Sequence, residues 1–288
     1  MKMWKCIDTA IVLQVEGRDA RRYLHNRLSN SIRDLTVGSA IEAAALSAKG
    51  RVEAFFAVYC QDEDRFLLIA DGGDVEQIRA SLMRFVVADR VVCSDLTSSS
   101  FLAHVSSPSL TTLSPTVSFP RVRIAGGGVD ALWLDCQPES VRNEVEAQYG
   151  PEISNSEYFA ARWKQGAPMF PEELNEAVVL TECGMRHAVS FTKGCYVGQE
   201  VMERSDAIGK LPRKLERICC ASPDVTMIES PLAIGSVVKS KDGATIGKTV
   251  SFGRDEVGDD ILVFALLSTG RYAQGEEVLC EGLSGIVV

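Results

Sequence analysis

The stretch from which this chain is best understood reads Lys-Gly-Cys-Tyr-Val-Gly-Gln-Glu, at residues 193–200. Cys195 stands between Gly194 and Gly198, and glycine permits a positive φ or a close backbone approach, so a tight turn could present the thiol. The neighbouring ammonium of Lys193 favours the thiolate, which is the form that acts as nucleophile or metal ligand. The pattern indicates a nucleophilic, redox-active or metal-binding thiol; the alternative is a tight turn whose cysteine only packs.

Charged residues at helical spacing follow this turn. Glu200 and Arg204 are four residues apart, so on a helix they would form a solvated ion pair worth about 0.3–0.5 kcal/mol. Alternatively, they hold the polar edge of a ligand together with Gln199. The spacing by itself leaves both interpretations open.

Composition places the chain among globular proteins with substantial cores. Its 288 residues exceed the usual size of one domain, so two or three modules are expected. The net charge of −9 argues against broad, nonspecific nucleic-acid binding, which requires a basic face, although a local basic patch is compatible with it. No apolar run reaches the roughly 20 residues that span a bilayer, so no membrane partner is expected.

Cysteine and histidine usage bears on location and on metal binding. The N-terminal segment runs directly into a strand-like pattern without a signal-peptide core, so the cytoplasm is the expected location. The nine cysteines form no C-x-x-C pair, and their odd number argues against a disulfide framework. The three histidines are widely separated, which argues against a preformed zinc site, and no metal ligands are predicted.

Strands and helices mix in the first part of the chain. Alternating hydrophobic residues predict strands at residues 9–15, 52–60, 65–70, 90–93 and 101–105. Helical spacing predicts helices at about residues 19–29, 139–148 and 155–165. Another helix is expected after the N-cap Asp74, with one apolar face formed by Val75, Ile78, Leu82 and Phe85. This order predicts an α+β fold rather than a doubly wound sheet.

The pattern changes after residue 208. Gly209-Lys210-Leu211-Pro212 resembles a linker, and short apolar runs separated by turns follow it, at residues 215–220, 236–239, 246–252, 261–267, 277–281 and 285–288. Many short strands at this spacing predict a small β-barrel or sandwich. We therefore divide the chain into residues 1–208 and 209–288.

Two further clusters could bind a ligand. An aromatic side chain beside cations, as in Arg162-Trp163-Lys164, could stack on a flat heterocycle and hold a carboxylate. The alternative is an amphipathic helix whose long cationic side chains reach solvent. Arg51 follows Lys49-Gly50 and precedes a strand, a position from which it could reach the mouth of a cavity.

The motif at 193–200 resembles the signature of the YgfZ family of folate-binding proteins, which is related to the glycine-cleavage T-protein, an aminomethyltransferase. Landmarks resembling those of the family occur in the same order along nearly the whole chain. They are Gly17-Arg18-Asp19-Ala20, Leu28-Ser29-Asn30, Lys49-Gly50-Arg51, Arg162 with Gly166-Ala167-Pro168, and Glu182-Cys183-Gly184-Met185. The eight-residue motif is specific, whereas each of the other landmarks is loose.

The resemblance implies two α+β modules around a central cavity that holds tetrahydrofolate, followed by a C-terminal β-barrel. It implies a role with iron–sulfur assembly or client proteins, with Cys195 as the functional residue. The remaining motif residues are Lys193, Gly194, Tyr196, Gly198, Gln199, Glu200 and Arg204. The residues implied to contact the reduced folate are Arg51, Arg162, Trp163 and Lys164.

Two departures from the T-protein pattern weaken the aminomethyltransferase interpretation more than the folate-binding one. Lys164 stands where the relatives carry a glutamate that holds the pterin, and Glu53 and Ala54 stand near the position of the transferase's aspartate. We therefore expect a folate-binding accessory protein for iron–sulfur proteins. A tetrahydrofolate-dependent aminomethyltransferase and an interaction platform without a small ligand are the alternatives.

Overall fold

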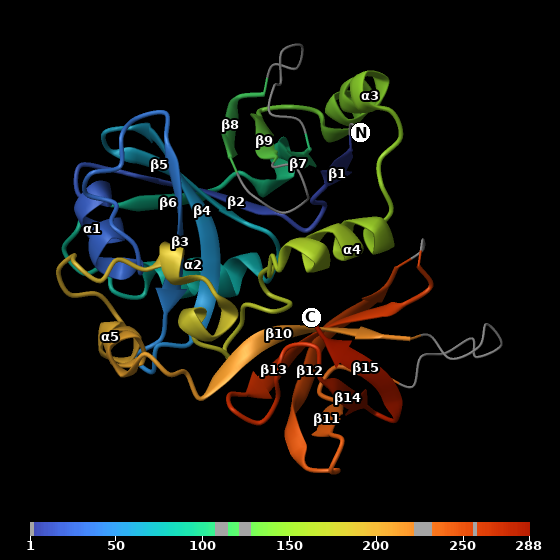
Figure 1. Ribbon diagram of the computed structural model, residues 1–288. Coiled ribbons are helices and arrows are strands. Elements are labelled where there is room, and N and C mark those ends of the chain that lie inside the picture. Colours follow the sequence, from blue (N-terminus) through green and yellow to red (C-terminus); the bar gives the residue numbers. More distant parts are fainter. Residues whose placement is uncertain (1–2, 107–114, 121–127, 222–231, 256–257) are drawn as a thin grey trace.

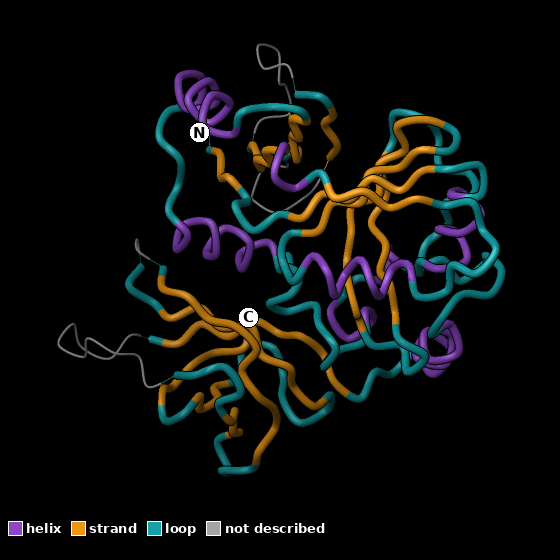
Figure 2. The backbone as a smooth tube through the Cα atoms, turned by 180° about the vertical axis from the view of Figure 1, so that it is seen from behind, coloured by secondary structure: helices purple, strands orange, loops and turns teal. Residues whose placement is uncertain are grey.

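The computed structural model describes residues 3–106, 115–120, 128–221, 232–255 and 258–288 (Figures 1 and 2). Two antiparallel sheets with their helices form the first part of the chain, and a closed barrel forms the last. The predicted α+β class with a C-terminal barrel is confirmed. The helices in the described ranges include none that is long and apolar enough to cross a bilayer.

The first sheet has five strands in the order β3-β4-β5-β2-β6. They are β2 (Ile11–Glu16), β3 (Ala40–Leu46), β4 (Val52–Asp62), β5 (Arg65–Ala70) and β6 (Val92–Asp95). Helices α1 (Ala20–Arg27) and α2 (Val75–Met83) pack against this sheet, where Leu24 and Leu82 are fully buried. As expected, the Asp74 carboxylate caps α2 by accepting a hydrogen bond from the Gln77 amide at 2.9 Å.

The second sheet has four strands in the order β1-β7-β9-β8. They are β1 (Trp4–Cys6), β7 (Ser100–Val105), β8 (Val117–Pro120) and β9 (Val129–Leu134). Helix α3 (Pro138–Tyr149) covers it through Val141 and Val145, which pack with Trp4 in one buried cluster. The sheet thus has its own hydrophobic core.

Helix α4 (Asn155–Gln165) lies between the four-stranded sheet and the barrel (Figure 1). Ser154 and Glu157 form a capping box at its start, and Gly166 ends it with a φ of 65°. The structure also has short 3₁₀ turns. One lies between β6 and β7, at Thr97–Ser99, and two lie after α4, at Leu180–Cys183 and Arg186–Ala188. Helix α5 (Gln199–Ile208) lies near α1, at the end of the molecule away from α4 (Figures 1 and 2).

The barrel closes in the order β10-β13-β12-β11-β14-β15. Its strands are β10 (Arg213–Cys220), β11 (Val237–Ser240), β12 (Thr245–Arg254), β13 (Ile261–Ser268), β14 (Glu277–Cys280) and β15 (Leu283–Val287). Each coincides closely with one of the predicted apolar runs. The division at residue 208 itself stays a prediction.

One local expectation differs from the structure, and strands β3, β8 and β9 were not predicted. Helix α2 ends at Met83, so Phe85 lies outside it and is 46% exposed rather than part of a buried helical face. Strand β3, an alanine-rich segment, was not predicted because alanine favours helices. Its pairing with β4, from Ala40 opposite Tyr59 to Leu46 opposite Val52, overrides that preference.

Candidate functional site

Lys193 attaches the motif loop to the end of α1. Its ammonium donates hydrogen bonds to the backbone carbonyls of His25, Leu28 and Asn30, the last at 3.1 Å. An ammonium has three donors, so these carbonyls use all of them and none is left for the Cys195 thiol. Burial lowers the pKa of Lys193 to about 7. Lys193 is therefore a clamp that fixes the loop to the end of α1, and its expected influence on the Cys195 thiol stays a prediction.

Tyr196 secures the other side of the thiol. Its ring is buried in the core of the five-stranded sheet, and the Lys193 ammonium lies 4.5 Å from the ring centroid. Burial raises the pKa of Tyr196 to about 12, and Glu203 adds to this effect. Its hydroxyl is buried without a hydrogen-bond partner among the described residues.

Gly198 allows the loop to approach the turn between β3 and β4. It has a φ of 85°, and a Cβ built there would lie 2.7 Å from the Ser47 carbonyl oxygen and 3.1 Å from the Gly50 Cα. Gly50 has a φ of 68°, and its own Cβ would lie 2.7 Å from the Cβ of Val201. By contrast, Gly194 has open space around it and no positive φ. Only the second glycine of the motif is thus needed sterically.

Between these anchors, Cys195 is presented to solvent. It is the one exposed cysteine of nine; Cys136 and Cys219 are partly exposed and the other six are buried. Burial raises the pKa of Cys136 above its ordinary value and that of Cys219 to about 11. The accessible, braced thiol of Cys195 therefore differs from every other thiol in the chain.

The polar residues after the thiol contact one another. Arg204 donates to Glu200 at 2.7 Å, and both side chains are largely exposed, as expected for a solvated i,i+4 pair. Gln199 donates to Glu203 at 2.6 Å and accepts from the Tyr196 amide at 3.3 Å. These contacts support the first turn of α5, and the alternative that these residues hold a ligand stays a prediction.

Arg51 links the first sheet to the segment before the motif. It donates to the Ala177 carbonyl at 2.9 Å and lies 3.7 Å from the buried carboxylate of Glu182. Arg213 of the barrel donates to both oxygens of Glu182, each at 3.0 Å, and to the same Ala177 carbonyl. Arg51 is thereby one side of a junction between the sheet and the barrel.

Arg162 is buried at the centre of the molecule, where its exposed fraction is 2%. Its guanidinium donates to the Ala167 carbonyl at 2.9 Å, to Glu173 at 3.1 Å and to Glu172 at 2.8 Å. Partial burial raises the pKa of Glu172, and Glu173 adds to this effect while Arg162 opposes it. Sequence patterns gave no reason to consider Glu172 as a site residue. Its contact with the buried Arg162 makes it a candidate in the structure.

Trp163 and Lys164 contact the barrel. The Trp163 indole donates to the Val263 carbonyl of β13 at 2.9 Å, and Arg217 lies 5.4 Å from its ring centroid. The exposed Lys164 ammonium lies 3.1 Å from Asp255. Three of the four residues predicted to contact folate, Arg51, Trp163 and Lys164, thus make contacts at junctions between parts of the fold, and their contact with folate stays a prediction.

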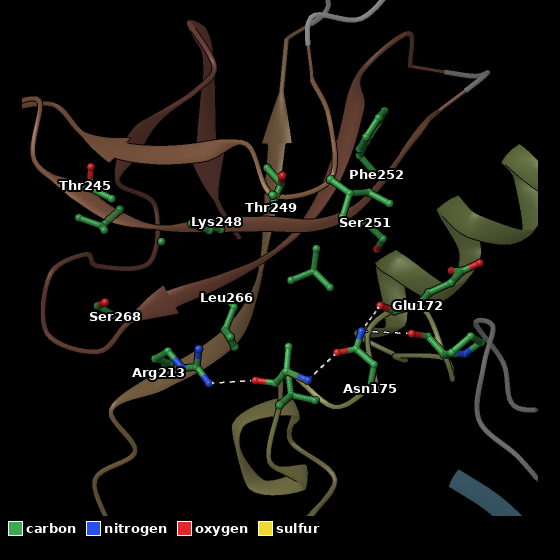
Figure 3. Close-up of a pocket in the computed structure, with 18 of the residues that line it drawn as sticks. Glu172, Asn175, Arg213, Thr245, Lys248, Thr249, Ser251, Phe252, Leu266 and Ser268 are labelled. Carbon is green, nitrogen blue, oxygen red and sulfur yellow. Dashed lines mark hydrogen bonds between the residues drawn. The ribbon is translucent and has the colours of Figure 1, made fainter. Parts of the chain in front are cut away.

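Two adjoining cavities lie where α4 meets the barrel. The larger has a volume of about 920 Å³ and is bounded by strand β12 and by the segment after α4 (Figure 3). The smaller, of about 410 Å³, also touches the N-terminal segment and is the only one of these two that Arg162 lines. They share Phe159, Glu172 and Phe252. Cys195 lines neither of them.

The larger cavity suits a flat ligand that carries carboxylates. Its walls are largely apolar, with side chains such as Val178, Ile246 and Leu266, and its volume lies within the usual range of small-molecule sites. Lys248 adds a cation that can pair with a carboxylate, whereas Arg213 is already paired with Glu182. Apolar walls match the fused ring and benzoyl group of a reduced folate, and Lys248 matches its glutamate, so the residues present fit the group that the resemblance implies.

A third cavity, of about 510 Å³, lies on the other side of the turn after α4. It is lined by Glu42 of β3, by Pro168 and by His187, whose imidazole lies 2.6 Å from the Glu42 carboxylate. Cys195 is absent from this lining as well. The thiol and the cavities therefore occupy different places in the fold.

The carboxylate of Glu53 is engaged by residues of α1 and of the C-terminal end of α2. It accepts hydrogen bonds from Arg27 at 2.9 Å, from the Ser81 hydroxyl at 2.6 Å and from Arg84 at 3.0 Å. The hydrogen bonds from Ser81 and Arg84, together with the charge of Arg27, lower the pKa of Glu53, although its burial acts in the opposite direction. The neighbouring Ala54 is buried.

Comparisons with known proteins agree with this architecture. No family model matches the chain. The tRNA-modifying protein YgfZ of Colwellia psychrerythraea is 23% identical over 248 residues, covering 80% of this chain and 74% of that protein. The human mitochondrial iron–sulfur cluster assembly factor IBA57 is 33% identical over 95 residues, covering 32% of this chain and 26% of that protein.

The fold is that of a solved aminomethyltransferase. Glycine cleavage system aminomethyltransferase T from Bartonella henselae superposes with a TM-score of 0.79, covering 99% of this chain and 84% of that one, at 14% identity. At that identity the likeness establishes the architecture only. This chain is therefore similar in sequence to YgfZ and to IBA57, and similar in fold to the glycine-cleavage T-protein, each at low sequence identity or over part of the chain.

Proposed function

We propose that this chain is a tetrahydrofolate-binding accessory protein that supports the assembly or repair of iron–sulfur proteins, with Cys195 as its functional thiol. The observation that carries the proposal is the exposure of Cys195, alone among nine cysteines, on a loop clamped by Lys193 and Gly198. A role with iron–sulfur proteins is supported by the name of one relative, the iron–sulfur cluster assembly factor IBA57, and the relation to YgfZ is supported by another. The cytoplasmic location expected from the sequence is part of the proposal.

In this proposal the cavity between α4 and the barrel binds folate, and the loop that carries Cys195 contacts a protein partner. At the junction of α4 and the barrel, apolar walls would enclose a reduced folate, with Lys248 facing its carboxylates. Bound there, tetrahydrofolate supplies a carrier for one-carbon groups. On the loop before α5, Cys195 faces solvent, so the thiol is accessible to a protein partner.

A single thiol supplies one of the four ligands that an iron–sulfur cluster usually takes. In the described part of the chain no group of three histidine, cysteine or acidic side chains could hold a metal ion. In this proposal the remaining ligands of any cluster at Cys195 come from a partner. The same exposed thiol could instead exchange electrons with a partner's cysteine.

Replacing the thiol tests the proposal. In a strain that lacks this protein, Cys195→Ala should fail to restore the activities of iron–sulfur enzymes, whereas Cys219→Ala should restore them. Full rescue by Cys195→Ala would exclude the proposed role of the thiol.

Calorimetric titration with tetrahydrofolate tests the cavity separately. Ala177→Trp places an indole on a residue that lines the larger cavity, and should weaken binding strongly. Ala147→Trp, on the exposed face of α3, is the matched control and should bind like the unchanged chain. Absence of heat with the unchanged chain would favour the interaction platform.

The aminomethyltransferase alternative is weakened by Glu53. A carboxylate occupied by two arginines and a serine hydroxyl is poorly placed to assist transfer from a substrate. Formation of methylenetetrahydrofolate from an aminomethylated donor would restore that alternative.

A further inference from the structure

Glu172 lies on the wall that the two adjoining cavities share. Figure 3 shows it at the end of the larger cavity opposite Thr245 and Ser268. Its Oε2 accepts a hydrogen bond from Arg162 at 2.8 Å, and no described residue donates to its Oε1. The side chain is 51% exposed. The protein therefore holds this carboxylate by one oxygen and leaves the other open to a ligand.

Arg162 is fixed from the core, and this sets the position of the Glu172 carboxylate. Glu173 is fully buried, and its Oε2 accepts from the Arg162 guanidinium at 3.1 Å and from the Met169 amide at 2.7 Å. The Ala167 carbonyl accepts from the same guanidinium nitrogen at 2.9 Å. The other terminal nitrogen donates to Glu172. The acceptor is thus oriented before any ligand binds, which reduces the entropy lost on binding.

Aromatic side chains line the smaller cavity. They are Tyr158, Phe159 and Phe252, and the larger cavity shares the last two. The Phe159 ring lies 6.0 Å from that of Phe264 between centroids, and a Cβ built on Gly253 would lie 2.5 Å from it. Packed on two sides, this ring keeps its position. Fixed aromatic faces beside a carboxylate favour a flat heterocycle.

The charges around the smaller cavity favour a ligand that donates hydrogen bonds over an anion. The charged residues that line it are Lys5, Asp8, Arg162 and Glu172. Lys5 donates to Glu152 at 2.5 Å, and Arg142 donates to Asp8 at 2.6 Å. Both lining cations therefore already have carboxylate partners, since Arg162 donates to two. An anion would face the open oxygen of Glu172, whereas N–H donors would satisfy it.

We propose that the Glu172 carboxylate, oriented by Arg162, binds the two adjacent N–H donors of the 2-amino-4-oxopyrimidine ring of a reduced folate. The exocyclic amine and the neighbouring ring N–H point the same way and match the two oxygens of one carboxylate. Each carboxylate oxygen accepts about two hydrogen bonds, so the bond from Arg162 leaves Oε2 able to accept another.

This inference rests on the proposed function and names the residue that selects the ring. The pterin would lie in the smaller cavity, between its aromatic side chains, and the rest of the folate would extend into the larger cavity toward Lys248. The volume of the smaller cavity, about 410 Å³, lies within the usual range of small-molecule sites.

Two ring fragments test the contact by calorimetric titration of the full chain. In 6,7-dimethylpterin the C2 substituent is an amine, and in 6,7-dimethyllumazine it is a carbonyl oxygen. The unchanged chain should bind the pterin at least about tenfold more tightly, because the lumazine places an acceptor against the carboxylate. Glu172→Gln should reduce this preference to about twofold or less, since an amide offers one acceptor and one donor group.

Glu176→Gln is the matched control for that variant. Glu176 is an exposed glutamate four residues further along that lines neither of the two cavities, so its variant should keep the full preference for the pterin. Urea unfolding of Glu172→Gln should remain cooperative, which separates a lost contact from a lost fold.

Blocking each cavity separately locates the ring. Ser156 lines only the smaller of the two cavities, so Ser156→Trp should weaken both dimethylpterin and tetrahydrofolate strongly. Ala177 lines only the larger, so Ala177→Trp should weaken tetrahydrofolate while dimethylpterin still binds. The reverse pattern would overturn the placement of the pterin.

Equal binding of the two fragments by the unchanged chain would overturn the proposal, as would an undiminished preference in Glu172→Gln. Guanosine carries the same two donors on a purine, so tighter binding of guanosine than of tetrahydrofolate would overturn the assignment to a folate. If the unchanged chain binds tetrahydrofolate without distinguishing the fragments, only this inference fails. If it binds no tetrahydrofolate, the proposed function fails and this inference fails with it.

Discussion

Gly198 of the motif lies against Gly50 of the turn between β3 and β4, so close that a Cβ on Gly198 would lie 3.1 Å from the Gly50 Cα. Two landmarks almost 150 positions apart in the sequence therefore meet backbone to backbone. Both glycines have a positive φ, which residues with side chains seldom adopt. This contact and the Lys193 clamp set the position of the loop that carries Cys195.

Replacing Gly198 by Ala should destabilise the fold. The left-handed φ alone costs about 1–2 kcal/mol, and the contact with the Ser47 carbonyl adds to it. Urea unfolding measures the loss of free energy. Gly194→Ala is the control: its Cβ meets open space, so the free energy of unfolding should change by less than about 0.5 kcal/mol. Equal effects of the two variants would contradict the assigned contact.

Lys193 should make stability depend on pH. Burial lowers its pKa to about 7 in the folded chain, from 10.5 when unfolded. Below pH 7 both states are protonated and the full cost of burying the charge is present. Between these two values only the unfolded state holds the proton, so stability should rise with pH, by at most about 1.4 kcal/mol per pH unit.

The measurement compares the free energy of unfolding of the unchanged chain with that of Lys193→Met between pH 6 and 10. The difference between them should grow in favour of the unchanged chain as pH rises. Lys49→Met, at an exposed lysine in the turn before β4, should follow the unchanged chain. Parallel curves for Lys193→Met and the unchanged chain would show that the lysine is not buried as described.

Cys195 should react first with an alkylating reagent. At pH 7.5, iodoacetamide should add one group rapidly to the native chain, and mass spectrometry of peptides should place it at residue 195. Cys219 should react slowly because burial and the neighbouring Asp260 raise its pKa to about 11. Labelling of Cys219 as fast as Cys195 would be inconsistent with this arrangement.

The buried ion pair of Arg162 and Glu173 should be costly to break. Glu173 is fully buried and also accepts hydrogen bonds from the Met169 amide and the Ser251 hydroxyl of the barrel. Glu173→Gln should lower the free energy of unfolding by about 3 kcal/mol, because it leaves buried donors without a carboxylate.

Glu172→Gln provides the comparison for that variant, since Glu172 contacts the same guanidinium from a half-exposed position. It should cost about 1 kcal/mol or less. Thermal or urea unfolding of the two variants side by side gives the result, and a larger loss at Glu172 would reverse the assignment of which carboxylate supports the core.

Local patterns in the sequence predicted most elements of the fold. The barrel strands coincide with apolar runs because short apolar runs bounded by turns mark strands that pack into a core. Phe85 shows the limit of such patterns: it continues the helical spacing of α2, but the helix ends at Met83 and the ring stays 46% exposed. Spacing alone carries no information about where a helix stops against its neighbours.

The sequence by itself determined the α+β class, the C-terminal barrel and the place of Cys195 in a distinctive motif, because these depend on local periodicity and residue type. Only the tertiary structure decided what the other motif residues contact. Lys193 lies two residues before Cys195 in the sequence, and its donors are taken by carbonyls at and just after the end of α1. Trp163 was predicted beside a ligand, yet its indole bonds to the barrel. Such partners come from distant parts of the chain, so only folding brings them together.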